Sequence, residues 1–321
     1  MWRNELVIIC MKNFYEVKQN NIFNSYLIVI LFFIFSFIVI YVLTKAYGMY
    51  MGYEAGGLGF IGIALIFSGV STFISYYFSD RIVLSLSRAK PANKKEHYYF
   101  YTSVENLSLS QGMPIPKLYV IEDTAPNAFA TGRNYDHSVI CATTGLLSKL
   151  NRTELEGVLA HELTHIKNYD MLLMSVVSVM VGIIALLGDW LLRSAWFGGR
   201  RTNDEDNKGQ LGVMIMVLGI VFAILSPIIA QLIQLAISRR REFLADAGSV
   251  EITRQPSGLI SALQKLYHDR EPLEAANKAT AHLYIVNPFK DNIKGAVGWF
   301  SNLFNTHPPI EKRISALQEM L

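Results

Sequence analysis

The sequence predicts an α-helical integral membrane protein in which four transmembrane helices carry a cytoplasmic α+β domain. Charged residues make up 17% of the 321 residues, against about 25% in an ordinary soluble domain, and the mean hydropathy is positive, at +0.28. The charges gather in two long stretches, which are separated by apolar segments without any charge. This distribution excludes a purely soluble enzyme, a disordered chain and a collagen-like fibre.

Four segments free of charge can each hold the roughly 20 apolar residues that cross a bilayer as a helix. They lie between Lys18 and Lys45, between Glu54 and Asp80, between Asp170 and Asp189, and between Lys208 and Arg239. Within them we expect membrane spans at residues 26–44, 58–78, 171–192 and 211–237. The first span begins too far from the N-terminus for a simple signal peptide, so it is expected to form a hairpin (26–78) with the second.

The two charge-bearing stretches, residues 79–170 and 238–321, are expected to fold as one domain that the second membrane pair (171–237) interrupts. Residues 1–25 are expected to form a cytoplasmic tail. A second methionine, Met11, is an alternative start, so no function is assigned to the first ten residues.

Basic residues near the ends of the spans predict the orientation, because loops rich in Lys and Arg stay in the cytoplasm. With four spans, both termini and both parts of the domain lie on one side. That side carries twelve such residues: Arg3, Lys12, Lys18, Arg81, Arg88, Lys90, Lys94, Lys95, Lys167, Arg239, Arg240 and Arg241. The other side carries five: Lys45, Arg193, Arg200, Arg201 and Lys208. We therefore expect a protein of the cell membrane whose soluble domain and both termini lie in the cytoplasm.

The composition also excludes several partners. A net charge of +3, without a basic stretch that contains interleaved aromatics, does not support nucleic-acid binding. The two cysteines, Cys10 and Cys141, provide neither a disulfide framework nor a thiolate metal site.

Within the first part of the domain, β-branched residues predict strands at residues 117–122 and 138–144. Residues 126–132 lie between them and are a candidate for a third, short strand. Thr153 and Glu156 have the spacing of a capping box, which predicts the start of a helix. Neither proline nor glycine interrupts residues 158–181, so we expect one long helix that continues into the third span.

The strongest chemical signal is the pentapeptide His161-Glu162-Leu163-Thr164-His165 on this helix. Histidines four residues apart lie on one helical face, so both imidazoles can bind one metal ion. Glu162 is rotated by about 100° from His161, where it can face a water on the metal without being a ligand. Zinc, one ion per chain, is the expected metal, with Glu162 as general base and later general acid. A chance match on an ordinary exposed helix is the alternative.

Glu242 is expected to be the third metal ligand, since two histidines and one glutamate form a known catalytic zinc set. Asp246 follows at i+4 on the same helical face, where it can accept the outer N–H of one zinc histidine. The alternative is a solvated run of charges, in which both acids pair with residues 239–241. Together with the histidine pair, Glu242 predicts a catalytic domain of the zincin-like (gluzincin) class.

The remaining histidines carry less information. His97, His137, His268 and His282 lack ligand spacing and are expected on the surface or in the core. His307 precedes two prolines that restrict its backbone, and Arg313 follows near an expected helix start. The residues alone favour a structural role for His307.

Four motifs, found in one order, resemble those of the HtpX family of bacterial membrane proteases and, more distantly, of the CAAX-prenyl endopeptidases. They are residues 126–132, 161–170, 238–246 and 307–313, and the resemblance covers nearly the whole chain. It implies that His161, His165 and Glu242 bind zinc and that Glu162 is the catalytic base.

The resemblance also implies roles outside the metal site. Asn127 and Ala128 are expected on an edge strand that holds the substrate backbone, while His307 and Arg313 are expected to flank the developing oxyanion. The expected protein is a membrane-bound zinc endopeptidase that cleaves peptide bonds of misfolded membrane proteins at the cytoplasmic face. Its partners are then polypeptide substrates and the lipid bilayer, and the part in quality control is implied by the resemblance alone.

Two other classes of protein remain as alternatives. A transporter with a metal site would need ionisable groups in the middle of its spans, whereas the expected spans contain only Asp189, near an end. A catalytically silent scaffold would lack Glu162 or a ligand, and all of these residues are present.

Overall fold

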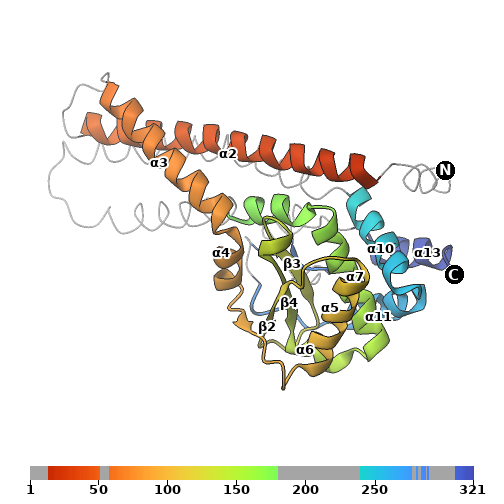
Figure 1. The fold of residues 1–321 in the computed structure, drawn as a ribbon. Helices are drawn as coiled ribbons and strands as arrows, with labels where there is room; N and C mark the ends of the chain where they lie inside the picture. Colours follow the sequence, from red (N-terminus) through yellow and green to blue (C-terminus); the bar gives the residue numbers. More distant parts are fainter. Residues whose placement is uncertain are drawn as a thin grey trace.

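The computed structural model describes residues 14–50, 58–179, 239–276 and 308–321, together with 280, 283–286 and 288. Figure 1 labels its elements, which are α2 (Phe14–Tyr50), α3 (Leu58–Tyr77), α4 (Ser79–Leu86), β1 (Lys90–Pro91), α5 (Tyr98–Ser110), β2 (Lys117–Ile121), β3 (Ala128–Gly132), η1 (Tyr135–His137), β4 (Ser138–Thr143), α6 (Thr144–Lys149), α7 (Arg152–Lys167), α10 (Arg239–Thr253), α11 (Pro256–His268) and α13 (Ile310–Gln318). A further helix, Asp170–Val179, follows α7.

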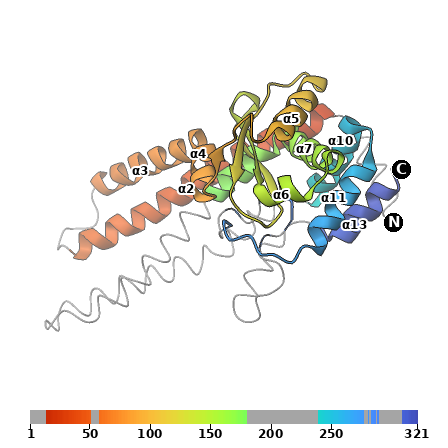
Figure 2. The same ribbon diagram turned by 90° about the horizontal axis from the view of Figure 1, so that it is seen from below.

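The helices α2 and α3 lie side by side; the N-terminal end of α2 passes over the domain near α10, while its other end and the start of α3 extend away from the domain (Figures 1 and 2). By length and composition, the 24 residues Gln19–Val42 within α2 can cross a membrane, since an 18-residue window within them has a mean hydropathy of 2.8. Residues 61–77 also pass this test when joined to α4, from which they are bent by 74°. Large apolar side chains are exposed on both helices, for example Ile30, Ile34, Ile38, Ile66, Phe67 and Phe73. A surface of this kind suits contact with lipid.

The membrane part differs from the sequence prediction at the N-terminus. Residues 14–25, which were expected in a tail, form the first turns of α2. Two polar side chains of this stretch, Asn21 and Ser25, are buried, and the Ser25 hydroxyl donates to the Asn21 carbonyl (2.7 Å). The expected third span (171–192) is described only as far as Val179, and its remainder, the fourth span and the loop between them lie outside the described residues.

The domain contains a four-stranded sheet in the order β1-β2-β4-β3. The three predicted strands are confirmed as β2, β3 and β4. Strand β2 pairs in parallel with β4, and β3 pairs antiparallel to β4, with Ala128 opposite Ala142. The two-residue strand β1 was missed, because a pair of residues carries no periodic signal. Strand β3 is thus the edge strand of the sheet on the side away from β1.

The helix α7 lies between the sheet and the pair α10 and α11 (Figures 1 and 2). Its apolar side chains Val158, Leu159, Leu163 and Ile166 are fully buried in the main core. Because α7 is packed on several sides, even its polar side chains from His161 to His165 are buried. The core therefore fixes the helix that carries the predicted metal ligands.

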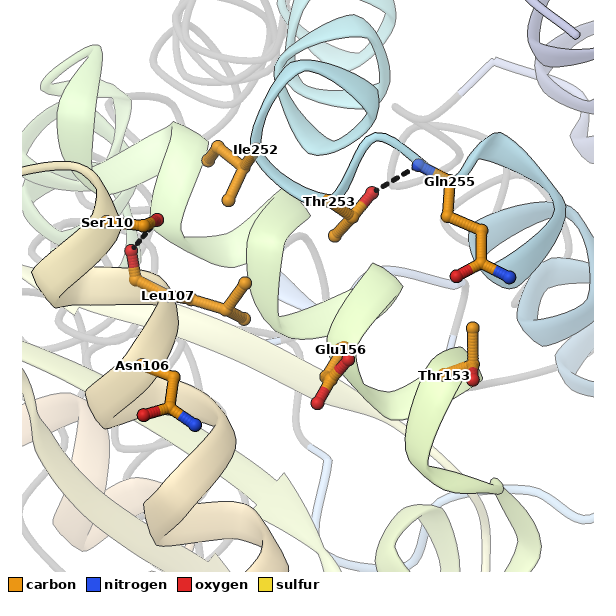
Figure 3. A pocket seen from close by; sticks show the side chains of 8 residues that line it. All are labelled: Asn106, Leu107, Ser110, Thr153, Glu156, Ile252, Thr253 and Gln255. Carbon is orange, nitrogen blue, oxygen red and sulfur yellow. Dashed lines mark hydrogen bonds between the residues drawn. The ribbon is translucent and has the colours of Figure 1, made fainter.

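The capping box of α7 was assigned to the wrong residues. Asn151 is the N-cap: its side chain accepts the Glu154 N–H, and the Glu154 side chain accepts the Asn151 N–H. Both candidate pairs have the same spacing, but Glu154 is buried and is further bound by Lys265 and Ser261 of α11. Thr153 and Glu156 instead line a surface pocket between α5, α7 and α10, and neither histidine of the pair lines it (Figure 3).

The expected long helix over residues 158–181 is also corrected, because it breaks after Lys167. Asn168 and Tyr169 form a turn, with Tyr169 in the left-handed region (φ 62°). The carbonyl of Lys167 accepts a hydrogen bond from the Tyr135 hydroxyl (2.9 Å), so a tertiary contact stabilises the broken end. A search for proline and glycine cannot detect a break of this kind, since neither residue produces it.

Candidate metal centre

The helix α7 presents His161 and His165 on one face, one turn apart, as the spacing predicts. Their rings meet edge to face, with centroids 4.7 Å apart, and their Nε2 atoms are 3.1 Å apart. Both residues are at most 5% exposed. Two imidazole nitrogens at this distance can share a proton or a cation.

A close approach between two helices brings Glu242 to the histidines. Gly248 of α10 packs against the Thr164 side chain, and a Cβ atom at this glycine would collide with it. The Ser249 hydroxyl donates to the Gly157 carbonyl of α7 (2.7 Å), which fixes the same contact. Six residues before Gly248 in α10, the Glu242 carboxylate lies 3.7 Å from His161 Nε2 and 3.5 Å from His165 Nε2.

These three ligand atoms have the spacing that zinc requires. Zinc–ligand bonds of about 2.0–2.1 Å in a tetrahedron place neighbouring ligand atoms about 3.3 Å apart. The observed separations of 3.1, 3.5 and 3.7 Å scatter around this value. Among the described residues, His161, His165 and Glu242 form the one group of His, Cys, Asp or Glu side chains that could hold a metal ion.

Each histidine has a carboxylate at its other ring nitrogen. His161 Nδ1 lies 3.0 Å from Asp246 Oδ1, and His165 Nδ1 lies 3.1 Å from Asp170 Oδ2. These contacts favour the tautomer with the proton on Nδ1, which leaves both Nε2 atoms to bind a metal. Asp246 was the expected partner of one zinc histidine, whereas Asp170 was missed, because a continuous helix would point Asp170 away from His165.

The carboxylates act differently on the two imidazoles. Burial lowers the pKa of His161 to about 4. Burial also acts to lower the pKa of His165, but the hydrogen bond that its ring donates to Asp170 and the charges of Glu242, Asp170 and Glu162 outweigh it and raise that pKa to about 9. A metal that binds His165 therefore displaces a proton from it at neutral pH.

Arg313 is fully buried beside the same carboxylates. Its guanidinium donates to both oxygens of Asp246, at 2.8 and 2.6 Å, and its Nη1 lies 3.5 Å from Glu242 Oε2. Burial acts to raise the pKa of Asp246, but the charge and hydrogen bonds of Arg313 outweigh it and lower this pKa. Arg313 therefore holds the Asp246 that orients His161, and its expected contact with an oxyanion stays a prediction.

Glu162 lies on the part of α7 that packs against β3, and its carboxylate accepts a hydrogen bond from the Ala130 N–H. Burial, reinforced by the charge of Glu242, raises its pKa to about 7, although His165, Arg313 and the Ala130 N–H act in the opposite direction. A nearby dication would favour the charged form of this carboxylate. A group balanced in this way can accept a proton and release it again near neutral pH.

The structure places Asn127 and Ala128 at the start of the edge strand β3, and both side chains are buried. A segment of this chain occupies that edge: Ile285 N–H donates to the Ala128 carbonyl (3.0 Å), and Asn127 Nδ2 donates to the Val286 carbonyl (2.9 Å). Substrate pairing at Ala128 would therefore require this bond to be exchanged. His307 lies outside the described residues.

Comparisons with known proteins place this arrangement in a family. The sequence profile of peptidase family M48 matches residues 95–321. The chain is 41% identical over 309 residues to a protease HtpX homologue of Thermoanaerobacter pseudethanolicus, covering 96% of this chain and 98% of that protein. It is 43% identical over 307 residues to the one from Dictyoglomus thermophilum, covering 96% and 95%.

A solved structure is also similar, the crystal structure of S. mikatae Ste24p, with a TM-score of 0.46 and 19% sequence identity over 80% of this chain and 58% of that chain. The resemblance found in the sequence is thus confirmed by the family profile and by the HtpX homologues. Peptidases of this family depend on zinc, which agrees with the ligand set of the histidine pair and Glu242. The chain therefore belongs to peptidase family M48 and is a membrane-associated metalloprotease of the HtpX type.

Proposed function

We propose that this protein is a zinc endopeptidase with four membrane spans that hydrolyses peptide bonds of misfolded membrane proteins at the cytoplasmic face. The observation that carries the proposal is the convergence of His161 Nε2, His165 Nε2 and the Glu242 carboxylate at 3.1–3.7 Å, with Glu162 beside them. Charge-free segments and the excess of basic residues on one side support the proposed topology.

The proposed chemistry divides between the metal and the chain. One zinc ion held by His161, His165 and Glu242 supplies Lewis-acid polarisation of the scissile carbonyl and lowers the pKa of water. Glu162 takes a proton from the attacking water and returns it to the departing amine, so no covalent acyl-enzyme forms. Asp246 and Asp170 hold the two imidazoles, and Arg313 holds Asp246. We retain His307 and Arg313 as predicted donors to the oxyanion.

The proposed substrate lies as an added strand along the outer edge of β3. This strand is next to Glu162, because the Ala130 N–H contacts the Glu162 carboxylate. Pairing through main-chain groups reads few side chains and supports broad specificity. Asn127 and Ala128 are proposed to hold the substrate backbone at the start of the strand, in place of residues 285–286.

Zinc content and casein cleavage by the detergent-purified protein test this function directly. We expect one zinc per chain, cleavage that a chelator abolishes, and recovery of cleavage when zinc is added back. Stoichiometric zinc without any cleavage would contradict the proposal and favour the silent scaffold or the metal-binding transporter.

The proposed topology has a separate test. Reporters fused after Asn168 and after Leu321 are expected to behave as cytoplasmic, and a reporter fused after Gly199 as external. The paired use of alkaline phosphatase, active outside, and β-galactosidase, active inside, gives each site a positive readout. External activity after Asn168 or Leu321 would overturn the arrangement with the catalytic domain in the cytoplasm.

Asp246→Asn is expected to lower zinc affinity or turnover by roughly 10–100-fold, the usual effect of losing the partner of a metal-bound histidine. The amide keeps the size of the side chain but presents less negative charge to His161 and to Arg313. The measurement is a zinc titration against a chromophoric chelator beside turnover per bound zinc. Asp136→Asn, an exposed aspartate on η1, is the matched control. Equal behaviour of the two variants would assign Asp246 to an ordinary ion pair.

A further inference from the structure

Asn21, near the N-terminal end of the described residues, binds the carboxylate oxygen of Asp170 that does not face His165. Asp170 is 1% exposed, and while its Oδ2 faces His165, its Oδ1 accepts a hydrogen bond from Asn21 Nδ2 at 2.8 Å. Arg241 Nε of α10 lies 3.6 Å from the same oxygen. The carboxylate that faces a metal histidine is thus held from two sides, by α2 and by α10.

Asn21 belongs to the apolar helix stretch Gln19–Val42 that can cross a membrane. The amide of Asn21 is only 4% exposed, whereas Asn20 and Phe23 on the same helix are exposed. Its Nδ2 donates a second hydrogen bond to the Asn168 carbonyl (2.9 Å), so both amide protons are used. The side chain therefore faces the catalytic domain and makes specific polar contacts there.

The backbone at Asn168 explains why these contacts affect the histidine. In a continuous helix Asp170 would lie five residues after His165, rotated by about 140° from it and unable to reach its ring. The break at Asn168 and Tyr169 turns Asp170 back toward His165, with Tyr169 in a left-handed conformation that is costly for a residue with a side chain. Asn21 binds both the turn, through the Asn168 carbonyl, and the carboxylate that the turn delivers.

We propose that Asn21 is a positioning residue of the metal centre, which holds Asp170 against His165 Nδ1 from the first membrane helix. The inference rests on the proposed zinc site and adds a member to it from outside the catalytic domain. The helix α2 then has two roles. Its apolar stretch anchors the protein in the membrane, and its Asn21 fixes the tautomer and direction of the metal ligand His165. Removal of the Asn21 amide leaves Asp170 free to turn toward Arg241, so His165 loses the acceptor that orients it.

The test measures zinc affinity in full-length, detergent-solubilised protein by competition with a chromophoric chelator at fixed pH. Asp170→Asn is expected to weaken zinc by roughly 10–100-fold. Asn21→Ala, which acts only through Asp170, is expected to weaken it less, by about three- to tenfold. Asn20→Ala, an exposed asparagine one residue away, is the matched control and should stay within about twofold of wild type.

A double variant distinguishes positioning from mere packing. If Asn21 acts through Asp170, then adding Asn21→Ala to Asp170→Asn should change zinc affinity by less than about twofold. The Asn21–Asn168 hydrogen bond is lost whether Asn21→Ala is added to the wild type or to Asp170→Asn, so its effect is common to both comparisons. The d–d spectrum of the cobalt-substituted protein should shift in Asn21→Ala as well, because the direction of His165 changes. Should Asn21→Ala fail to fold, Asn21→Asp keeps the shape of the side chain and replaces the donated bond by repulsion, with the same expected loss of affinity.

Each contrary result has a distinct meaning. Unchanged zinc affinity and cobalt spectrum in Asn21→Ala, with only a lower melting temperature, would overturn the inference and leave the zinc site intact. An additive loss in the double variant would show that Asn21 acts through the Asn168 turn and not through Asp170, which also overturns it. A wild-type protein without zinc would overturn the proposed function, and this inference with it.

Discussion

Glu162→Gln is expected to lower peptide-bond cleavage by roughly 10²–10⁴-fold while one zinc ion per chain stays bound. Glutamine has nearly the same shape but cannot take a proton from the attacking water, and the three ligand atoms come from other residues. The carboxylate is buried beside the ligands, with a pKa raised to about 7 mainly by burial, so no solvent-exposed acid can easily replace it. Turnover per bound zinc, measured with a fluorogenic peptide or casein, is the appropriate quantity.

The control for this variant is Glu156→Gln on the same helix. Glu156 pairs with Arg152 at the surface (2.9 Å) and lines the pocket of Figure 3, to which neither histidine contributes. It should keep wild-type turnover and zinc content. Near-normal turnover in Glu162→Gln would remove Glu162 from the mechanism, and loss of zinc in that variant would show that it belongs to the ligand set.

Glu242→Ala is expected to lose both zinc and activity. Its carboxylate supplies the third ligand atom, and the two imidazoles alone hold zinc far more weakly. The loss in zinc affinity should exceed the roughly 10–100-fold expected for the outer partners Asp246 and Asp170, since they act only through a ligand. A chelator titration should therefore give Glu242→Ala a lower zinc affinity than Asp246→Asn. This comparison tests whether Glu242 is a direct ligand and Asp246 an indirect one.

Loss of the Glu242 carboxylate also removes a buried negative charge 3.5 Å from Arg313, so the fold is monitored by a melting curve. Glu251→Ala, an exposed position on the same helix, is the matched control and should retain zinc and activity. Retention of stoichiometric zinc in a folded Glu242→Ala protein would show that the third ligand lies elsewhere.

The sequence by itself predicted the features that depend on local geometry. Helical periodicity places His161 and His165 on one face and Asp246 one turn after Glu242, whatever surrounds these helices. The β-branched bias of residues 117–122 and 138–144 was sufficient to predict β2 and β4, and a short strand between them was found as β3. The family resemblance rested on the same motifs and was confirmed by the comparisons.

Contacts between distant segments were decided only by the tertiary structure. Packing of Gly248 against Thr164 sets how close α10 comes to α7, and hence whether Glu242 reaches the histidines. Asn151 is the helix cap because its partner Glu154 is buried against α11. Thr153 has a glutamate at the same spacing but lacks this tertiary contact. A local pattern cannot rank such options, because the energy that separates them comes from residues far away in the chain.

The break after Lys167 is the clearest example of this limit. Residues 158–181 have no local signal that ends a helix, and the left-handed Tyr169 is unfavourable by itself. The break persists because Tyr135, Asn21 and His165 bind the carbonyls and the carboxylate that it exposes. The sequence therefore determined which residues could bind the metal, and the tertiary structure determined which carboxylates orient them, since only packing brings α2, α7 and α10 to one point.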